Sequence, residues 1–243
     1  MRTFIKWMGN KSKHLNKIIK YIPEDYNTYI EPFVGSGVMF LKLEPEKWII
    51  NDINKDLINI WKCVKKNPDN IIENFKEFGQ IFKRKSTENK KKYCKEIVSK
   101  LDKMSYDIDR ASTYMLMTSC AYMGTILINN EFKFNGLDMN IYVNNRYSFL
   151  NNNIHDNLKY VSEYLNDSTG KIYNKDYKYI LEKAKKGDFV FLYPPYIEEH
   201  DYHFKYNKDE VLDNKFLKDL VKELKKLDKK DVKWLMTQAD TKE

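Results

Sequence analysis

The sequence predicts an α/β fold built on a parallel sheet. The first third of the chain contains two strand-and-helix pairs: a short strand at 28–31 leads to a helix from 38, and a buried strand at 48–50 leads to a helix over 55–65. The second helix carries its apolar side chains at helical spacing. Strand, helix, strand, helix in this order is typical of proteins in which neighbouring strands run parallel.

A second group of elements lies near the other end of the chain. Buried strands are predicted at 171–173 and 189–192, followed by a helix at 211–227 and a last strand at 233–237. These strands are short continuous apolar runs, as expected for a sheet covered on both faces. The two groups together predict one sheet assembled from both ends of the sequence.

The middle of the chain has a different pattern. Residues 68–127 are predicted to be mostly helical with a lysine-rich centre, and residues 129–153, rich in Asn, Tyr and Phe, to form loops or short hairpins. We therefore expect a core made of residues 1–65 and 166–243, interrupted by an insertion at 66–165.

Composition and charge exclude several classes of protein. Hydrophobic residues make up 42% and aromatics 14%, which is enough for a sizeable core and excludes a disordered chain. No apolar run is long enough to span a membrane, and the N-terminus has no signal peptide. Cys63, Cys94 and Cys120 are far apart, which favours reduced thiols over a disulfide scaffold or a zinc ribbon. We expect a cytoplasmic, intracellular protein without a metal site. The net charge of +8 favours nucleic acid as a partner.

A glycine-containing turn follows the first predicted strand. It reads Glu31-Pro32-Phe33-Val34-Gly35-Ser36-Gly37, and glycines let a backbone turn sharply and approach a ligand. The full GxGxxG fingerprint is absent, so an ordinary turn explains it equally well. Asp52, at the end of the next strand, is placed to bind ribose hydroxyls or, like Asn54, to cap the helix from Lys55. Taken together, the turn and Asp52 favour an adenosine-containing cofactor.

Two further motifs carry aromatic side chains. Tyr193-Pro194-Pro195-Tyr196 directly follows the strand at 189–192, so it forms either a rigid turn or a stiff ligand-binding loop at the carboxyl edge of the sheet. Lys6-Trp7-Met8-Gly9-Asn10-Lys11 places a tryptophan between lysines, which can stack on a ring and neutralise a carboxylate. Taken alone, this second motif is better explained as an anchored tail.

In order and spacing these motifs resemble the Dam-type family of DNA adenine-N6 methyltransferases, over nearly the whole chain. The family's KWxGGK is similar to Lys6–Lys11, with Asn10 in place of a glycine, and its EPFVGxG is present as Glu31–Gly37. Its NDxN is present as Asn51–Asn54, and Arg110–Gly136 resembles the family's helix and following loop.

The resemblance implies a Rossmann-like methyltransferase sheet, S-adenosylmethionine as cofactor, and an inserted, mostly helical target-recognition domain. It implies that Asp52 binds the ribose and that an acid and an aromatic, Asp176 and Tyr177, hold the adenine. The residues that it assigns to the cofactor are Trp7, Lys11, Glu31, Phe33, Gly35, Gly37, Asp52, Asp176 and Tyr177.

The catalytic loop departs from the family at one position. The family has DPPY where this chain has Tyr193-Pro194-Pro195-Tyr196. In the family, the acid and the first proline's carbonyl accept hydrogen bonds from the adenine amine, and the last aromatic stacks on the flipped base. A phenol is bulkier and is neutral near pH 7, so the alternative is an impaired or inactive protein that still binds DNA and cofactor. In the family the sheet also continues past the segment resembling 235–241, so we expect a protein longer than this chain.

By resemblance, the insertion reads duplex DNA. Lysines suit phosphates, and Asn and Arg suit base edges, although a solvated helix face and ordinary turns would explain the same residues. The residues predicted to contact DNA are Lys90, Lys91, Lys92, Asn129, Asn130 and Arg146. A restriction endonuclease is a candidate partner, and the sequence favours no oligomeric state. A methyltransferase acting on RNA, a free nucleotide or a protein is the rival function, while a nicotinamide dehydrogenase is disfavoured by the incomplete glycine fingerprint.

Overall fold

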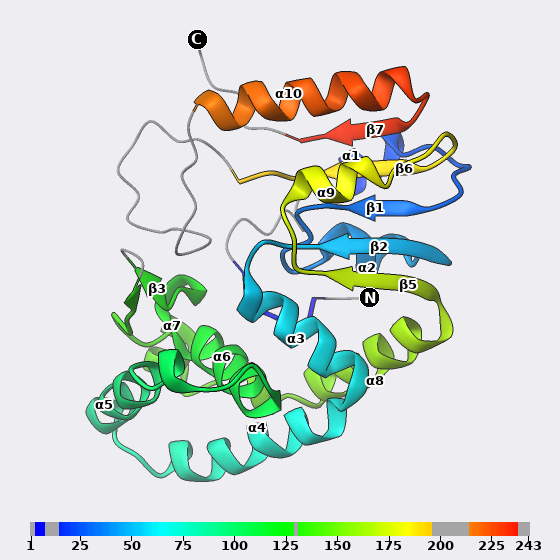
Figure 1. Ribbon diagram of the computed structural model, residues 1–243. Helices are drawn as coiled ribbons and strands as arrows, with labels where there is room; N and C mark the ends of the chain where they lie inside the picture. The colour runs from blue at the N-terminus through cyan, green and yellow to red at the C-terminus, as the bar shows by residue number, and fades with distance from the viewer. Residues whose placement is uncertain (1–2, 8–14, 129–130, 196–213, 238–243) are drawn as a thin grey trace.

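A parallel sheet forms the centre of the molecule, in a computed structural model that describes residues 3–7, 15–128, 131–195 and 214–237 (Figure 1). Its strand order is β5-β2-β1-β6-β7, and every neighbouring pair is parallel. The strands are β1 (Tyr29–Glu31), β2 (Lys47–Asn51), β5 (Thr169–Tyr173), β6 (Phe189–Leu192) and β7 (Lys233–Met236). The α/β fold expected from the alternation of strands and helices is confirmed.

Helices cover the sheet, and two apolar clusters fill the space between the layers. The larger cluster contains Trp48 and Trp61, and the smaller contains Val190 and Leu220. Because both faces are covered, β1 and β6 are buried at every position, which explains the continuous apolar sequence of β6, while β1 ends on the buried acid Glu31. The helices of this part are α1 (Leu15–Ile18), α2 (Val38–Leu43), α3 (Lys55–Lys66), α9 (Tyr177–Glu182) and α10 (Asn214–Lys229).

The insertion is mostly helical, as predicted for residues 68–127, and its described part carries one short hairpin. Its helices are α4 (Pro68–Lys83), α5 (Thr87–Val98), α6 (Ile108–Cys120), α7 (Met139–Asn144) and α8 (Asn152–Asp167), and its hairpin pairs β3 (Leu127–Ile128) with β4 (Glu131–Phe132). Residues 129–153, predicted to form only loops or short hairpins, also contain the helix α7. Short 3-10 turns lie at Ile19–Tyr21, Leu101–Lys103, Tyr122–Gly124 and Ser148–Leu150.

The insertion packs directly on the sheet-bearing part. Helix α6 lies against α3, and α8 returns along α3 to reach the edge strand β5 (Figure 1). The expected boundaries after residues 65 and 165 fall in the last turns of α3 and α8, and they stay a prediction. Within the described ranges, no helix combines the length and the apolar character that a membrane span needs.

Candidate functional site

The glycine turn between β1 and α2 adopts a backbone that other residues rarely tolerate. Gly35 and Gly37 have φ angles of +49° and +66°. A Cβ added at Gly37 would lie 2.5 Å from the Trp61 ring, so the turn has room only for glycine there. The Trp61 indole also donates a hydrogen bond to the Gly35 carbonyl at 3.1 Å, which fixes the turn on α3.

Asp52 lies beside this turn, at the carboxyl end of β2. One carboxylate oxygen accepts from the Gly35 N–H at 3.0 Å and the other from the Asn54 N–H at 2.9 Å. Asn54, and not Asp52, caps α3, because its side chain accepts from the Leu57 N–H at 2.9 Å. Burial raises the pKa of Asp52 to about 6. The capping role that the sequence left open to Asp52 therefore belongs to Asn54, and ribose binding by Asp52 stays a prediction.

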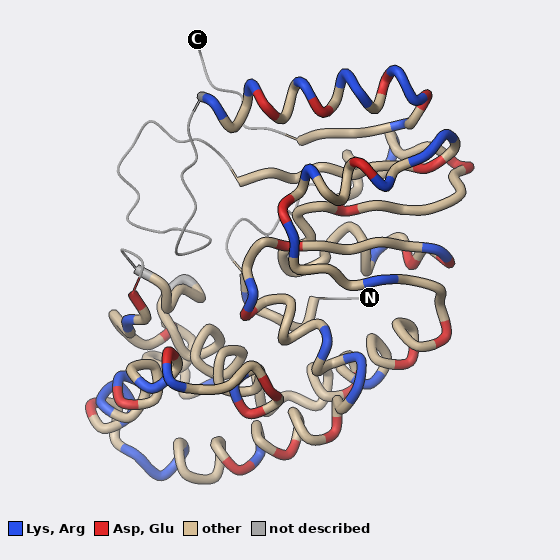
Figure 2. Tube along the Cα trace, in the orientation of Figure 1, with Lys and Arg blue, Asp and Glu red and all other residues tan. Residues whose placement is uncertain are grey.

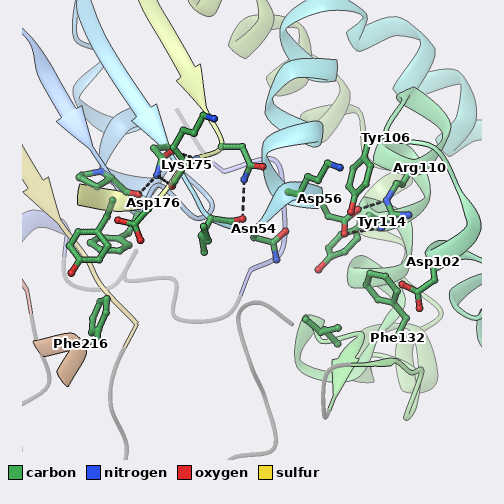
Figure 3. A pocket seen from close by; sticks show the side chains of 18 residues that line it. Asn54, Asp56, Asp102, Tyr106, Arg110, Tyr114, Phe132, Lys175, Asp176 and Phe216 are labelled. Carbon is green, nitrogen blue, oxygen red and sulfur yellow. Dashed lines mark hydrogen bonds and ion pairs between the residues drawn. The ribbon is translucent and has the colours of Figure 1, made fainter. Parts of the chain in front are cut away.

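A cavity of about 610 Å³ opens beside the turn (Figure 3). Phe33 and Tyr177 line one end with ring centroids 5.3 Å apart, and Asp176 caps α9 by accepting from the Lys178 N–H at 2.8 Å. The Tyr177 hydroxyl is buried without a hydrogen-bond partner among the described residues, and burial raises its pKa to about 12. The opposite end is lined by the insertion, through Asp102, Tyr106, Arg110, Tyr114, Leu127 and Phe132.

Glu31 is the last residue of β1, directly before the turn, and it does not line this cavity. Its side chain is 2% exposed and accepts a hydrogen bond from the Tyr29 hydroxyl at 2.7 Å. Burial raises the pKa of Glu31 to about 8, although hydrogen bonds from Tyr29 and the Phe40 backbone lower it. Of the residues predicted to bind the cofactor, Phe33, Asp176 and Tyr177 line this cavity, whereas the described residues Trp7, Glu31, Gly35, Gly37 and Asp52 do not.

Trp7 covers the glycine turn from the N-terminal segment. A Cβ added at Gly35 would lie 3.3 Å from the Trp7 ring, and that ring is 6.4 Å from the ring of Tyr114 on α6. Lys6 anchors the segment by an ion pair of 2.5 Å to Asp138 and a hydrogen bond to the Ala121 carbonyl. Lys11 lies outside the described residues.

The two-proline loop begins where β6 ends, beside β1 in the sheet. Tyr193 is half-buried and packs against the larger apolar cluster, and Pro194 is buried. The loop thus starts at the same carboxyl edge as the glycine turn and Asp52. Tyr196 lies outside the described residues.

The sequence of residues 7–243 matches the family model of the D12 class N6 adenine-specific DNA methyltransferases. The chain belongs to this family. Its sheet is therefore a Rossmann-like methyltransferase sheet, as the resemblance implied.

Relatives of the methyltransferase come from distant organisms. It is 35% identical to the type II methyltransferase M1.LlaDCHI of Lactococcus lactis subsp. cremoris, over 81% of this chain and 66% of that protein. It is 29% identical to the type II methyltransferase M.MjaIII of Methanocaldococcus jannaschii, over 98% and 84%, and 27% identical to the DNA adenine methylase of Haemophilus influenzae, over 99% and 80%. The chain thus spans about two thirds of the first relative's length and more of the other two.

The lysines predicted to contact DNA differ in their surroundings. Lys91 and Lys92 are exposed on α5. Lys90 is only 5% exposed, and its ammonium donates to Asn145 Oδ1 at 3.0 Å and to the Tyr147 hydroxyl at 2.9 Å. These two groups hold the charge of Lys90 inside the insertion, so a phosphate contact by Lys90 would require it to leave them, and that contact stays a prediction.

Of the other three residues predicted to contact DNA, the structure describes only Arg146. Arg146 is exposed at the end of α7, where a side chain can reach a partner. Asn129 and Asn130 lie outside the described residues. Charged residues of both signs are spread over the helices of the insertion (Figure 2).

Sequence reasoning missed two sets of contacts beside the cavity, one within the methyltransferase core and one between the core and the insertion. Asn51 donates to the Pro32 and Lys175 carbonyls, both at 2.9 Å, and thereby ties the glycine turn to the segment before α9. Arg110 and Asp56 form a buried ion pair beside the cavity. The sequence offered one signal for these contacts: Asn51 is the first residue of the NDxN motif, and Asp56 lies two residues after its end. Among the described residues there is no cluster of metal-ligating side chains.

Proposed function

We propose that this methyltransferase transfers a methyl group from S-adenosylmethionine to the N6 amine of an adenine in duplex DNA. The observation that carries the proposal is the hydrogen bond between Asp52 and the Gly35 N–H, next to residues 51, 53 and 54 that line the cavity, in a chain of the D12 class. A carboxylate fixed at the end of the second strand suits ribose hydroxyls.

The chemistry of the cavity fits the cofactor. The rings of Phe33 and Tyr177 offer apolar faces for an adenine, and Asp176 lies beside them as an acceptor for its exocyclic amine. The buried Tyr177 hydroxyl, which no described residue satisfies, has an unused hydrogen bond for a ligand. We propose that Trp7, whose ring lies against Gly35, contacts the methionine end. When bound, S-adenosylmethionine supplies an electrophilic methyl group.

The residues at the end of β6 must activate a weak nucleophile. The adenine amine is weak because its lone pair is delocalised into the ring, and an oxygen acceptor beside the Pro194 carbonyl would localise it. Tyr193 offers a neutral phenol oxygen on a longer side chain, so we expect slow turnover. Membership of the D12 class favours an active enzyme over a protein that binds DNA and cofactor without transferring a methyl group. Tyr193 is the observation that favours such an inactive protein.

Contacts to DNA are proposed for the insertion. Lys91, Lys92 and Arg146 are exposed there and carry positive charge, which suits phosphates and guanine edges. Membership of the family supports two further parts of the proposal, a restriction endonuclease as partner and a cytoplasmic location. The basic insertion favours duplex DNA over RNA, free nucleotides or proteins as the methyl acceptor.

Two measurements test the proposal. Titration calorimetry should detect S-adenosylmethionine binding to the chain, and Asp52→Ala should weaken it at least tenfold. Methyl transfer to an adenine-containing duplex should be slow for the chain and about a hundredfold faster for Tyr193→Asp, because one preorganised acceptor is typically worth that much. Sequencing of modified bases would then identify the target site. Lack of cofactor binding would refute the proposal, and an ordinary rate that Tyr193→Asp leaves unchanged would refute the role of Tyr193.

A further inference from the structure

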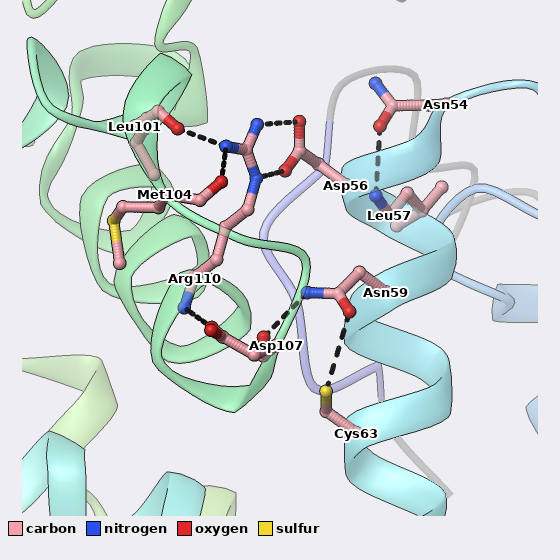
Figure 4. Close-up of polar contacts among 9 residues, drawn as sticks. All are labelled: Asn54, Asp56, Leu57, Asn59, Cys63, Leu101, Met104, Asp107 and Arg110. Carbon is pink, nitrogen blue, oxygen red and sulfur yellow. Dashed lines mark hydrogen bonds and ion pairs between the residues drawn. The ribbon is translucent and has the colours of Figure 1, made fainter.

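One face of α6 holds the start of α3. Arg110 and Tyr114 are one helical turn apart on α6, so their side chains lie on the same face. Arg110 contacts Asp56 in the first turn of α3 (Figure 4). Tyr114 contacts Asn54, the residue that caps α3. All four residues line the cavity described above.

The Arg110 guanidinium is almost fully satisfied by protein groups. Its side chain is 3% exposed, and it contacts both Asp56 carboxylate oxygens, at 2.5 and 3.0 Å. It also donates to the Leu101 carbonyl and, at 3.0 Å, to the Met104 carbonyl, and it lies 4.2 Å from the centre of the Tyr106 ring. A buried ion pair adds little net stability compared with apolar packing, but its bidentate geometry fixes two elements relative to each other.

Tyr114 contacts three segments: the start of α3, the N-terminal segment and the hairpin. It is 3% exposed, its side chain is hydrogen-bonded to that of Asn54, and burial raises its pKa. Its ring lies 6.4 Å from that of Trp7, which covers Gly35, and 6.0 Å from that of Phe132 in the hairpin. The hydroxyl therefore reaches the residue whose backbone N–H binds Asp52.

These contacts form a continuous path from the insertion to the ribose position. Tyr114 holds the Asn54 side chain, the Asn54 N–H holds one Asp52 oxygen at 2.9 Å, and the Gly35 N–H holds the other at 3.0 Å. We infer that Arg110 and Tyr114 are positioning residues for the cofactor, so that the insertion is a working part of the cofactor site as well as the proposed DNA-reading region. This inference rests on the proposed function, since it assigns the ribose hydroxyls to Asp52.

The path predicts that small changes in α6 weaken cofactor binding without unfolding the protein. Tyr114→Phe removes one hydroxyl and keeps the ring, and it should raise the dissociation constant of S-adenosylmethionine about threefold to tenfold. Tyr164→Phe is the matched control, because the Tyr164 hydroxyl donates at 2.9 Å to Pro45, before the amino end of β2 and away from the cavity. That control should leave the dissociation constant unchanged.

The ion pair is tested by a substitution that keeps the packing. Arg110→Met combined with Asp56→Leu replaces the buried charges by apolar side chains of similar size, which commonly preserves or raises stability. The paired variant leaves the Leu101 and Met104 carbonyls without the Arg110 donor, so it should melt a few degrees lower but stay folded, and it should bind S-adenosylmethionine several-fold more weakly. An effect on melting without an effect on binding would assign the pair to stability alone and overturn this part of the inference.

A double-mutant cycle with Asp52→Asn decides whether the effect of Tyr114 passes through Asp52. If it does, Tyr114→Phe should weaken binding in the original chain and add less than twofold in the Asp52→Asn background. An equal loss in both backgrounds, or no loss in the original chain, would overturn the inference while cofactor binding by the original chain supports the proposed function. Failure of the original chain to bind S-adenosylmethionine would overturn both.

Discussion

Glu31 makes the stability of the protein depend on pH in a direction opposite to that of most carboxylates. Its pKa rises from 4.5 to about 8 because the side chain is buried, with Asp52 adding a smaller repulsion. Near neutral pH the folded protein therefore holds a neutral acid that accepts from the Tyr29 hydroxyl. The informative perturbation is Glu31→Gln, which keeps the shape and remains neutral at every pH.

The magnitude follows from the two pKa values. Between pH 4.5 and about 8 the folded state binds a proton that the unfolded state has lost, so the free energy of unfolding falls as the pH rises. The limiting slope is about 1.4 kcal/mol per pH unit, and the loss over the whole window is roughly 4–5 kcal/mol. The contribution of neutral Glu31 is complete below pH 4.5 and is lost by about pH 8, above which the slope returns to zero.

The assay compares thermal unfolding of the two proteins from pH 5.5 to 8. The melting temperature of the original chain should fall relative to that of Glu31→Gln by roughly 4–8 °C between pH 6 and 8. Other titrating groups cancel in the difference, since the two chains differ at one position. A difference that stays constant with pH, or that grows in favour of the original chain, would show that Glu31 is ionised in the folded protein and would refute the reasoning.

Two further predictions concern the surface of the insertion and the glycine turn. Replacing Lys91 and Lys92 together by Gln should lower the slope of log affinity for duplex DNA against log salt by one to two units, measured by fluorescence anisotropy. The control is Lys47→Gln, at the exposed amino end of β2, which should leave this slope unchanged. An unchanged slope in the double variant would show that Lys91 and Lys92 belong to an ordinary solvated helix face. Gly37→Ala should destabilise the protein by about 1–3 kcal/mol and weaken S-adenosylmethionine binding, because the added Cβ meets a tryptophan ring at 2.5 Å. Gly136→Ala, where an added Cβ meets nothing within 4 Å, is its control, and equal melting temperatures for the two alanine variants would contradict the prediction.

The sheet and the neighbourhood of Asp52 were predictable from local sequence. The helix after Asn54 was found because Leu57, Ile60 and Val64 repeat at helical spacing. Asp52 was expected near Gly35 because the carboxyl ends of neighbouring parallel strands share one edge, and their hydrogen bond of 3.0 Å bears this out. These inferences needed only the period of the apolar pattern and the rules of parallel sheets.

The environment of individual lysines was harder to predict. Lys90 stands in a run of three lysines, which suggests a solvated surface, and yet Lys90 is buried. It shares a helix face with the buried Cys94 and Val98, four and eight positions later, so the helical period carried a signal that charge alone obscured. Its partners Asn145 and Tyr147 lie on a distant segment, and no local pattern predicts that contact.

The contact between Arg110 and Asp56 was beyond sequence reasoning for a similar reason. The two residues are 54 positions apart, and each belongs to a motif that explains it locally, as part of a helix or as a first-turn acid. Only the crossing of α6 over α3 brings them together.

The order of strands in the sheet has a consequence for how the chain reaches this structure. β1 and β2 are close in sequence and can pair early, whereas the bond between Trp48 and Ser168, beside the β2–β5 pair, joins residues 120 positions apart. Closing such a long loop costs entropy that is repaid only after the chain between the two ends has become compact. We therefore expect the helices between α3 and α8 to collapse first and β5 to join the sheet late. During synthesis, the exposed edge of β2 would then wait, unpaired, until well over half of the chain has left the ribosome.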